Sequence, residues 1–513
     1  MAETTFSYWR TRARRQDGSI FILALTALFV LLALGAVSLD VAMQSSVRAQ
    51  CKQDRSAAQA LAEAGANCAE AWLRAQGYPP IASAPIDPPD GAGALSTGTY
   101  RAQIIPAAGN SMAWRKSYII VSTGTSMRHQ ATSAVKMIVR QQSFALYSYF
   151  TDEEISPITN STIWFIAADR LYGPAHTNDQ FHIRWDASAD APIFWGTVSS
   201  CAATVDWNPS GPDSISQWER VIQGGQDALT LDADYIPLPE ESSAQQTAAW
   251  GSESGFPSQS GVYLPVDGAA PRGGIYIQGD SCITFALNGD VGQTVSVVQG
   301  GTRTDVRTDL AGNATAVDAY TGSSGSWVLE STSHYAGLPN GVIYSTGHIT
   351  SLSGTLADSL MDGNQLVTRN AWTVCTDLSN QKNITITSDL QYATHPAPEQ
   401  LLDSADNLRA ACLGVVANNV VVKTTANSVR IDGTILANSS FYNYYWNSGV
   451  PKGALTVSGG TIQRNRGPVG QFSGTRITSG YSKDYHYDPR MADYPPPFFP
   501  TTGQYDVLSW QCD

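Results

Sequence analysis

Twenty consecutive residues near the N-terminus, Ile20 to Leu39, contain no charged side chain. About 20 apolar residues are enough for a helix to cross the hydrocarbon core of a bilayer, so this run predicts a membrane-spanning helix. Four arginines, at positions 10, 12, 14 and 15, precede the run, and positive charge is retained on the cytoplasmic side of a membrane. We therefore expect a single-pass protein with a cytoplasmic N-terminus and most of its chain beyond the membrane. The residues expected to pack in the bilayer and against neighbouring helices are Ile20, Leu23, Leu25, Leu28, Leu31, Leu34 and Leu39.

Three interpretations of this run compete. A secretory signal peptide has a shorter apolar core, about 7–15 residues, followed by a small-residue cleavage site. A plain anchor needs only the length of the run. A third interpretation is a much longer helix, because the residues after Asp40 are rich in strong helix formers and lack proline and glycine until Gly65. A helix from Ser19 to Gln76 would be roughly 87 Å long. Its second half contains small residues at helical spacings, namely Ala60, Ala64, Cys68, Ala71 and Ala75.

The short basic leader ending at Gly18, the apolar run and the segment "ALAEAGANCAEAWL" together resemble the N-terminus of PilX-type minor pilins and related large pseudopilins. The resemblance implies that a prepilin peptidase cuts after Gly18 and leaves Ser19 as the mature N-terminus. It also implies insertion in the bacterial inner membrane and packing against the helices of other pilins. Most pilins have Glu at the fifth mature position, where this chain has Leu23. Some large pseudopilins at the filament tip also lack this Glu, so the departure favours a tip position or else leaves polymerisation itself in question.

Beyond the helix, a Pro/Gly-rich loop leads into three strand-like runs. They begin at Thr99 and span Lys116 to Gly124 and Ala131 to Gln142, with alternating or β-branched residues between turn residues. A long helix followed by a small antiparallel sheet is the expected α+β arrangement of a pilin head. The predicted organisation is a leader at 1–18, a membrane and assembly helix at 19–76, a β head at 77–142 and a β-rich extracytoplasmic domain at 143–513.

The region 143–513 consists of short β-branched segments separated by Gly, Asn and Asp turns, without a strict period. This pattern of short strands and turns is typical of an irregular parallel β-helix or solenoid, and a β-sandwich is the alternative. Residues 214–260, with a short helix, and 297–337 are expected to be excursions from it. Segments such as "LYGPAHTND", "GVIYSTGHI" and "SKDYHYDPRM" resemble an uncharacterised domain that follows PilX-type N-termini in some bacteria. That resemblance implies no mechanism.

Charge and cysteine usage exclude several functions. A net charge of -13 argues against nucleic acid as a partner, since little positive charge is available to neutralise phosphates. The seven cysteines form no CxxC pair, which argues against a zinc ribbon or a thioredoxin-type site, and their odd number leaves at least one unpaired within an exported chain. No G-x-S-x-G, Walker A, HExxH or EF-hand pattern occurs. No cofactor is therefore expected.

Two segments are the best candidates for ligand binding. In "SKDYHYDPR", Asp484, His486 and Asp488 alternate, so on a strand their side chains would point the same way and could bind Ca²⁺ or a sugar. The alternative, which we favour, is that Arg490 pairs with Asp488 and holds the C-terminal tail. The segment "FYNYYWNSG", residues 441–449, is rich in aromatic rings suited to sugar stacking or protein adhesion, unless the rings cap a β-helix core. Its candidate binding residues are Tyr444, Tyr445 and Trp446.

Two further polar groups have weaker functional interpretations. Residues His176, Asn178, Asp179, His182 and Asp186 could approach a metal, but "GPAHTN" is more typical of a turn. The acidic run Asp152, Glu153 and Glu154 could supply paired carboxylates for glycoside hydrolysis, although a solvated turn is the more common structure for such a run.

Taken together, the residues and the resemblance predict a non-catalytic, pilin-like component of a type IV pilus or type II secretion-like filament. It would lie in the inner membrane before assembly and in a periplasmic or extracellular filament afterwards, at or near the tip. There it would initiate assembly or contact a surface polysaccharide or protein. The alternatives are a membrane-anchored carbohydrate-binding or carbohydrate-active β-helix protein and a plain anchored envelope protein.

Overall fold

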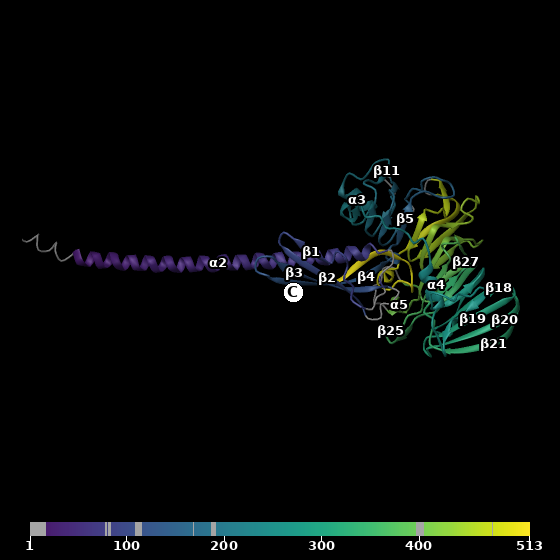
Figure 1. The fold of residues 1–513 in the computed structure, drawn as a ribbon. Helices are drawn as coiled ribbons and strands as arrows, with labels where there is room; N and C mark the ends of the chain where they lie inside the picture. Colours follow the sequence, from purple (N-terminus) through teal and green to yellow (C-terminus); the bar gives the residue numbers. More distant parts are fainter. Residues whose placement is uncertain are drawn as a thin grey trace, which may run out of the picture. The chain divides into compact units, whose positions relative to one another are not determined.

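The computed structural model divides the chain into two compact units, which are described separately: residues 1–140 with 505–513, and residues 141–504. Figure 1 shows their helices and strands. The residues described are 17–76, 80, 84–107, 115–167, 169–185, 191–396, 405–473 and 476–512. The arginines of the leader, Gly77 at the start of the predicted β head, and Asp186 lie outside them.

The first unit begins with a single helix of 58 residues, α2 (Asp17–Arg74), drawn in purple in Figure 1. This confirms the long apolar helix predicted from the sequence, within two residues at each end. Its most apolar stretch has a mean hydropathy of 2.9 and is 0% buried within the structure. Leu23 is 69% exposed and Leu31 66%. A helix of this length and composition near the N-terminus fits a membrane anchor or a signal sequence.

The second half of α2 packs against a five-stranded sheet. Three of its strands, β2 (Gly98–Pro106), β3 (Ser117–Ser126) and β4 (Thr132–Ser143), match the three predicted runs and pair antiparallel. The outer strands are β1 (Ala92–Leu95) and β35 (Thr501–Cys512), in the order β1-β2-β3-β4-β35. The sequence boundaries placed all of 143–513 in one domain, whereas β35 returns to the sheet of the first unit. Pairing between strands so distant in the chain leaves no local sequence signal.

Small residues allow the helix and the sheet of the first unit to approach closely. A Cβ on Gly124 of β3 would lie 2.0 Å from the carbonyl oxygen of Ala58. At the turn between β3 and β4, His129 pairs with Asp54 of the helix. The predicted small-residue stripe is offset from the buried one, since Ala60, Ala71 and Ala75 are exposed. Alanines recur on more than one side of α2, so spacing alone does not select the packed side. The buried hydrophobic residues of the helix are Ala58, Leu61, Ala62, Ala66, Ala69 and Leu73.

The second unit contains three ladders of parallel strands. In the first ladder the chain order is broken, because β32, late in the sequence, pairs with β5, the first strand of the unit. In spatial order this ladder comprises β16 (Ile275–Gln278), β22 (Val342–Ser345), β26 (Ala371–Thr376), β28 (Cys412–Val422), β30 (Thr434–Asn443), β32 (Thr461–Asn465), β5 (Tyr149–Glu153), β7 (Ala175–Thr177), β10 (Val198–Ser200) and β12 (Leu229–Thr230).

The second ladder shares β28 and β30 with the first, and the third shares β27 with the second. The second consists of β17 (Ser281–Asn288), β23 (Ile349–Leu356), β27 (Ile384–Tyr392) and the distal halves of β28 and β30. The third runs from the end of β27 through β29 (Val429–Asp432) and β31 (Pro451–Ser458) to β34 (Arg476–His486). Parallel ladders with apolar inner faces bury long in-register columns of side chains. Ile343, Val374, Val415 and Ile435 form one such column and are each 0% exposed.

The two predicted excursions are present. The first contains α3 (Ile215–Val221) and α4 (Ser243–Trp250), and the second is a series of antiparallel strands that continues from β17 through β18 (Gly292–Gln299), β19 (Thr302–Asp309), β20 (Ala314–Ser323) and β21 (Ser326–Ala336). The remaining short elements are η1 (Phe144–Leu146), β6 (Arg170–Leu171), β8 (His182–Arg184), β9 (Ile193–Phe194), β11 (Asp206–Asn208), η2 (Gln226–Ala228), β13 (Gly261–Tyr263), β14 (Val266–Asp267), β15 (Ala270–Pro271), β24 (Leu360–Asp362), β25 (Gln365–Thr368), α5 (Ala405–Arg409), β33 (Gly470–Ser473) and α6 (Arg490–Asp493).

Candidate functional site

Asp484, His486 and Asp488 do not form one site, and the favoured pairing of Arg490 with Asp488 is confirmed. Asp484 and His486 lie on the outer side of β34, with 2.8 Å between His486 Nε2 and Asp484 Oδ1. Their side chains are 46% and 28% exposed. Asp488 follows the end of the strand, is buried, and accepts from the guanidinium of Arg490 at 2.6 and 2.9 Å. Side chains alternate in direction only within the strand, and β34 ends at His486. Asp488 therefore has different surroundings from Asp484 and His486.

Outward side chains of the third ladder form two rows in register with Asp484 and His486. Arg430 of β29 is aligned with Thr456 of β31, and Thr456 with Asp484 of β34. Because side chains alternate along a strand, the residues two positions on form a second, parallel row. We name these two rows the ladder face: Asp389, Arg430, Thr456 and Asp484 in the first, and Gln391, Asp432, Ser458 and His486 in the second.

Hydrogen bonds hold the ladder face in place around Asp432, whose side chain is 0% exposed. Its Oδ2 accepts from the backbone N–H of Tyr392 at 2.9 Å and from His395 Nδ1 at 2.8 Å. Arg430 Nε lies 2.8 Å from its Oδ1, and Arg430 also donates to Ser458 Oγ at 3.2 Å. The face is therefore pre-organised, because its charged groups are held by neighbours while His395, Asp389 and Asp484 still reach solvent.

A stack of aromatic rings continues the ladder face beyond β34. The ring of His486 stacks on Tyr172 with centroids 5.4 Å apart, and Tyr172 stacks on Trp195 at 4.2 Å. Each of these two aromatic residues directly follows a two-residue strand, β6 or β9, and precedes a glycine. A Cβ on Gly196 would lie 2.1 Å from the carbonyl oxygen of Gly173, so glycine is needed for the two turns to lie this close.

Sequence reasoning missed Tyr172 and Trp195, although a signal was present. The segments "RLYGPAHTN" and "IFWGTVSSC" share an aromatic residue followed by glycine at the same place, just before a strand of the first ladder. This is an internal repeat, and repeats of this kind place equivalent side chains on top of one another. Asp432 and His395 were also missed, because the sequence between them carries no motif that brings them together.

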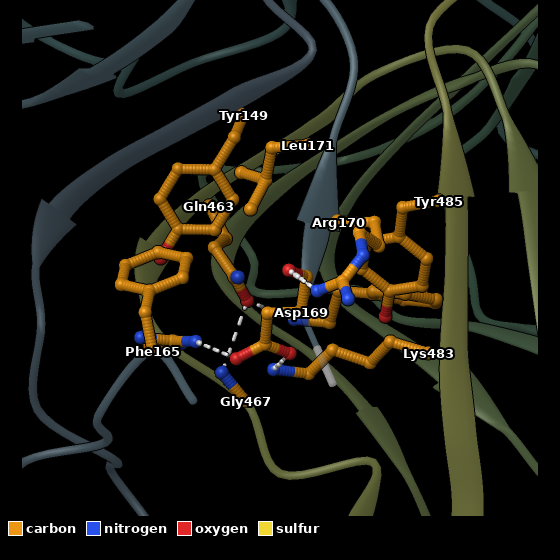
Figure 2. Close-up of a pocket in the computed structure, with 11 residues that line it drawn as sticks. Tyr149, Phe165, Asp169, Arg170, Leu171, Gln463, Gly467, Lys483 and Tyr485 are labelled. Carbon is orange, nitrogen blue, oxygen red and sulfur yellow. Dashed lines mark hydrogen bonds and ion pairs between the residues drawn. The ribbon is translucent and has the colours of Figure 1, made fainter. Parts of the chain in front are cut away.

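A buried ionic network lies behind the ladder face (Figure 2). Lys483, on the inner side of β34, pairs with Asp169 at 3.1 Å, as Figure 2 shows. Arg466 pairs with Glu154 at 3.2 Å and approaches Asp169 at 3.8 Å. Burial lowers the pKa of Lys483, and the Asp169 carboxylate partly opposes this. The cavity among these side chains measures about 20 Å³, which is room for about one water, so the network serves to position β34 rather than to hold a ligand.

The acidic run before this network does not form a solvated turn, in contrast to the favoured sequence interpretation. Glu154 is 0% exposed and pairs with Arg466. The hydroxyls of Tyr149 and Thr151 also donate hydrogen bonds to its carboxylate. Glu153 accepts from Asn465, and Asp152 from Asn178. The three carboxylates have different partners and make no paired catalytic arrangement.

The two histidines of the possible metal group lie in different environments. His176 is buried, with its Nδ1 2.8 Å from Ser199 Oγ and its Nε2 3.0 Å from Asn178 Oδ1. His182, on β8, pairs instead with Asp206 at 2.8 Å. Asp179 accepts from the backbone N–H of Glu154. Across the described residues, no group of three or more His, Cys, Asp or Glu side chains is placed to hold a metal ion.

Burial of His176 makes the stability of the second unit depend on pH. Burial lowers the pKa of His176, so the unfolded chain takes up a proton near pH 6.5 before the native side chain does. Stability is therefore lost as the pH falls below about 6.5, since the unfolded state then binds more protons. We expect His176→Gln to lose less of its unfolding midpoint between about pH 7 and pH 5 than the unmodified protein. His334→Gln, on exposed β21, is the control, and an unchanged pH slope in the His176 variant would contradict the expectation.

The aromatic turn between β30 and β31 forms a second exposed patch. Tyr444 is 51% exposed, and Lys423 Nζ lies 4.5 Å from the centre of its ring. Lys452 lies 5.4 Å from the ring of Tyr445, which makes an edge contact with Tyr444. Phe441 packs in the apolar core. The alternative in which the aromatic rings cap the core therefore holds for Phe441 and not for the rings of the turn. Trp446 belongs to the same turn and is half-buried.

Comparison with known proteins finds a similarity over only part of the chain. A family model described as "Domain of unknown function (DUF4900)" matches residues 113–203, a span that includes β3, β4 and the strands from β5 to β10. No curated protein and no solved structure matches the chain. The matched span covers less than half of the chain and contains Tyr172 and Trp195 of the aromatic stack, and the chain is similar to this uncharacterised family over that span.

Proposed function

We propose that this chain is a pilin-like, single-pass protein of the bacterial envelope, a component of a type IV pilus or type II secretion-like filament. The observation that supports this most is the division of α2 into two halves. Its first half exposes an apolar surface long enough to cross a bilayer, and its second half is packed on an antiparallel sheet. A plain anchor has no need of a continuous helix that also forms the core of the following domain.

Assembly would use the exposed half of α2. In lipid, helices associate through close packing of side chains rather than through the hydrophobic effect, and the exposed face of α2 offers such a surface. Leu23 replaces the acidic residue that most pilins place at this position, which favours a place at the tip of a filament. The second unit would then lie outside the membrane, where we propose that it binds a partner and carries out no catalysis.

We further infer that the second unit is an irregular β-helix. Three parallel ladders and in-register apolar columns support this, whereas a β-sandwich is built from antiparallel sheets. In this interpretation the strands from β5 to β12 continue the stack beyond β32, so the spatial order of the turns differs from their order in the chain.

Processing at Gly18 tests the pilin proposal. In a host that expresses a prepilin peptidase, we expect N-terminal sequencing and intact mass to find Ser19 as the first residue. Gly18→Ala should leave the full-length chain, because the resemblance to pilins implies that the peptidase recognises the glycine before the cleaved bond. Gly35→Ala is the control, since a Cβ at that position meets nothing within 4 Å and should leave cleavage unchanged. Cleavage after the apolar run, or none at all, would overturn the proposal.

A further inference from the structure

We propose that the ladder face, together with the stacked rings of Tyr172 and Trp195, binds an extended, uncharged glycan chain. The observation behind this is the alignment of polar side chains on four adjacent parallel strands, continued by aromatic rings on the same side. Asp432 and Ser458 of the second row are buried, so the groups offered to a ligand are those of the first row with His486 and His395. This binding does not depend on how the N-terminus is processed or on filament assembly, so the two proposals can fail independently.

The dimensions of the site favour an extended ligand over a compact one. Neighbouring strands lie about 4.8 Å apart, so with the two ring spacings the face reaches roughly 24 Å from Asp389 to Trp195. The cavity beside Tyr172 and His486 measures only about 10 Å³. Compact ligands need concave sites of about 300–1,000 Å³. A linear polymer lying across the strands can instead meet one polar residue after another without a deep pocket.

The polar groups suit sugar hydroxyls, which both donate and accept hydrogen bonds. An ionised carboxylate offers about four acceptor positions, and the protein occupies only part of this capacity at Asp484, where Thr456 and His486 are the partners. His395 adds an exposed imidazole whose Nδ1 is held by Asp432. Because these groups are already oriented, a ligand would gain their hydrogen bonds without the entropic cost of ordering them.

The aromatic end of the face supplies apolar contact. Trp195 is 39% exposed, and its indole carries a single N–H donor. Tyr and Trp side chains combine an apolar body with a polar tip, which makes them favourable where a partner has both kinds of surface. Sugar rings have such surfaces, because their C–H groups and hydroxyls alternate around one ring.

Peptides and polyanions fit this face less well. An added peptide strand needs a free sheet edge, whereas β29 and β31 are paired on both sides. The exposed charges at Asp389 and Asp484 are negative, and the nearest guanidinium, of Arg430, is already paired with Asp432. Negative charge on the face repels an anionic polymer, so an uncharged glycan is the favoured ligand.

Binding is measured with the full-length chain in lipid nanodiscs, which avoid detergents with sugar headgroups. The probes are cellohexaose, N-acetylated chitohexaose and an oligogalacturonate of equal length, each titrated by calorimetry. We expect at least one of the two uncharged probes to bind and the oligogalacturonate not to bind. Asp484→Ala and Trp195→Ala should each weaken that binding about tenfold or more, the effect of losing a hydrogen bond to a charged group or a large apolar contact.

Matched controls distinguish loss of the site from loss of the fold. Asp484→Asn keeps the shape of the side chain and should retain part of the affinity, and every variant should keep the unfolding midpoint of the unmodified protein. Tyr444→Ala and Lys423→Ala alter the other exposed aromatic patch and should leave binding unchanged. No binding of either uncharged probe, equal binding of the oligogalacturonate, or loss of binding only in the Tyr444 and Lys423 variants would overturn the proposal.

Discussion

Replacing Arg490 by methionine is expected to destabilise the second unit by about 3–5 kcal/mol, because the change leaves a buried carboxylate without its partner. Arg490 donates to both oxygens of Asp488 and to the backbone carbonyls of Asn407, Ala410 and Ala411 at 2.7–2.9 Å. The side chains of Arg490 and Asp488 are 3% and 1% exposed. Methionine fills most of the volume but can satisfy none of these acceptors.

Hydrogen exchange resolved along the chain is the measurement for the Arg490 variant. Amides in β27 and β28, whose connecting segment supplies the three carbonyls, should lose protection, and those of β2 and β3 should keep it. The double variant Asp488→Asn with Arg490→Met should recover part of the stability, because it removes the unpaired charge as well. Equal protection in Arg490→Met and the unmodified protein would show that the ion pair contributes little.

Replacing Gly124 by alanine is expected to cost about 3 kcal/mol in the first unit, at the upper end of the usual range for overpacking. The new Cβ would lie 2.0 Å from the carbonyl oxygen of Ala58 and 2.5 Å from the backbone nitrogen of Ala62. Both are backbone atoms of α2, so no side-chain rotation can relieve the contact, and the helix has to move away from β3. Apolar contacts between the helix and the sheet are lost in consequence.

Exchange of the amides in the second half of α2 measures this effect. We expect faster exchange there and in β3, with the second unit unchanged. Gly301→Ala is the control for an added methyl group, because its Cβ would meet only one atom, at an ordinary 3.6 Å. If Gly124→Ala exchanges as slowly as the control, the helix and the sheet are not packed as closely as the structure shows.

The predictable parts of the fold were those set by neighbouring residues. The apolar run and the helix formers after it predicted α2, and alternation between turn residues predicted β2, β3 and β4. Two distant pairings had no such signal. β35 joins the sheet of the first unit, and β5 pairs with β32, strands some 312 positions apart. The alternation of residues along a strand shows which of its sides is apolar, but it does not specify the neighbouring strand, because several strands can pair with the same pattern.

The candidate site was predictable to a similar extent. Alternation correctly indicated that Asp484 and His486 share a side of one strand, since side-chain direction has a period of two. It failed at Asp488, because the strand ends before that residue and the carboxylate turns to Arg490. It also could not find Asp432 or Tyr172, whose contacts with the same face depend on which strands lie next to one another.

The sequence by itself determined the long apolar helix, the β-rich character of the rest and the alternating outward polar residues, because these follow from local composition and spacing. Tertiary structure decided which side of α2 is buried, which carboxylates are paired with arginine and which polar residues align across strands. The physical reason is that burial and ion pairing depend on neighbours brought together by folding. A carboxyl group has the same chemistry at positions 154, 484 and 488, and only its surroundings decide whether it is a buried partner of arginine or an exposed group.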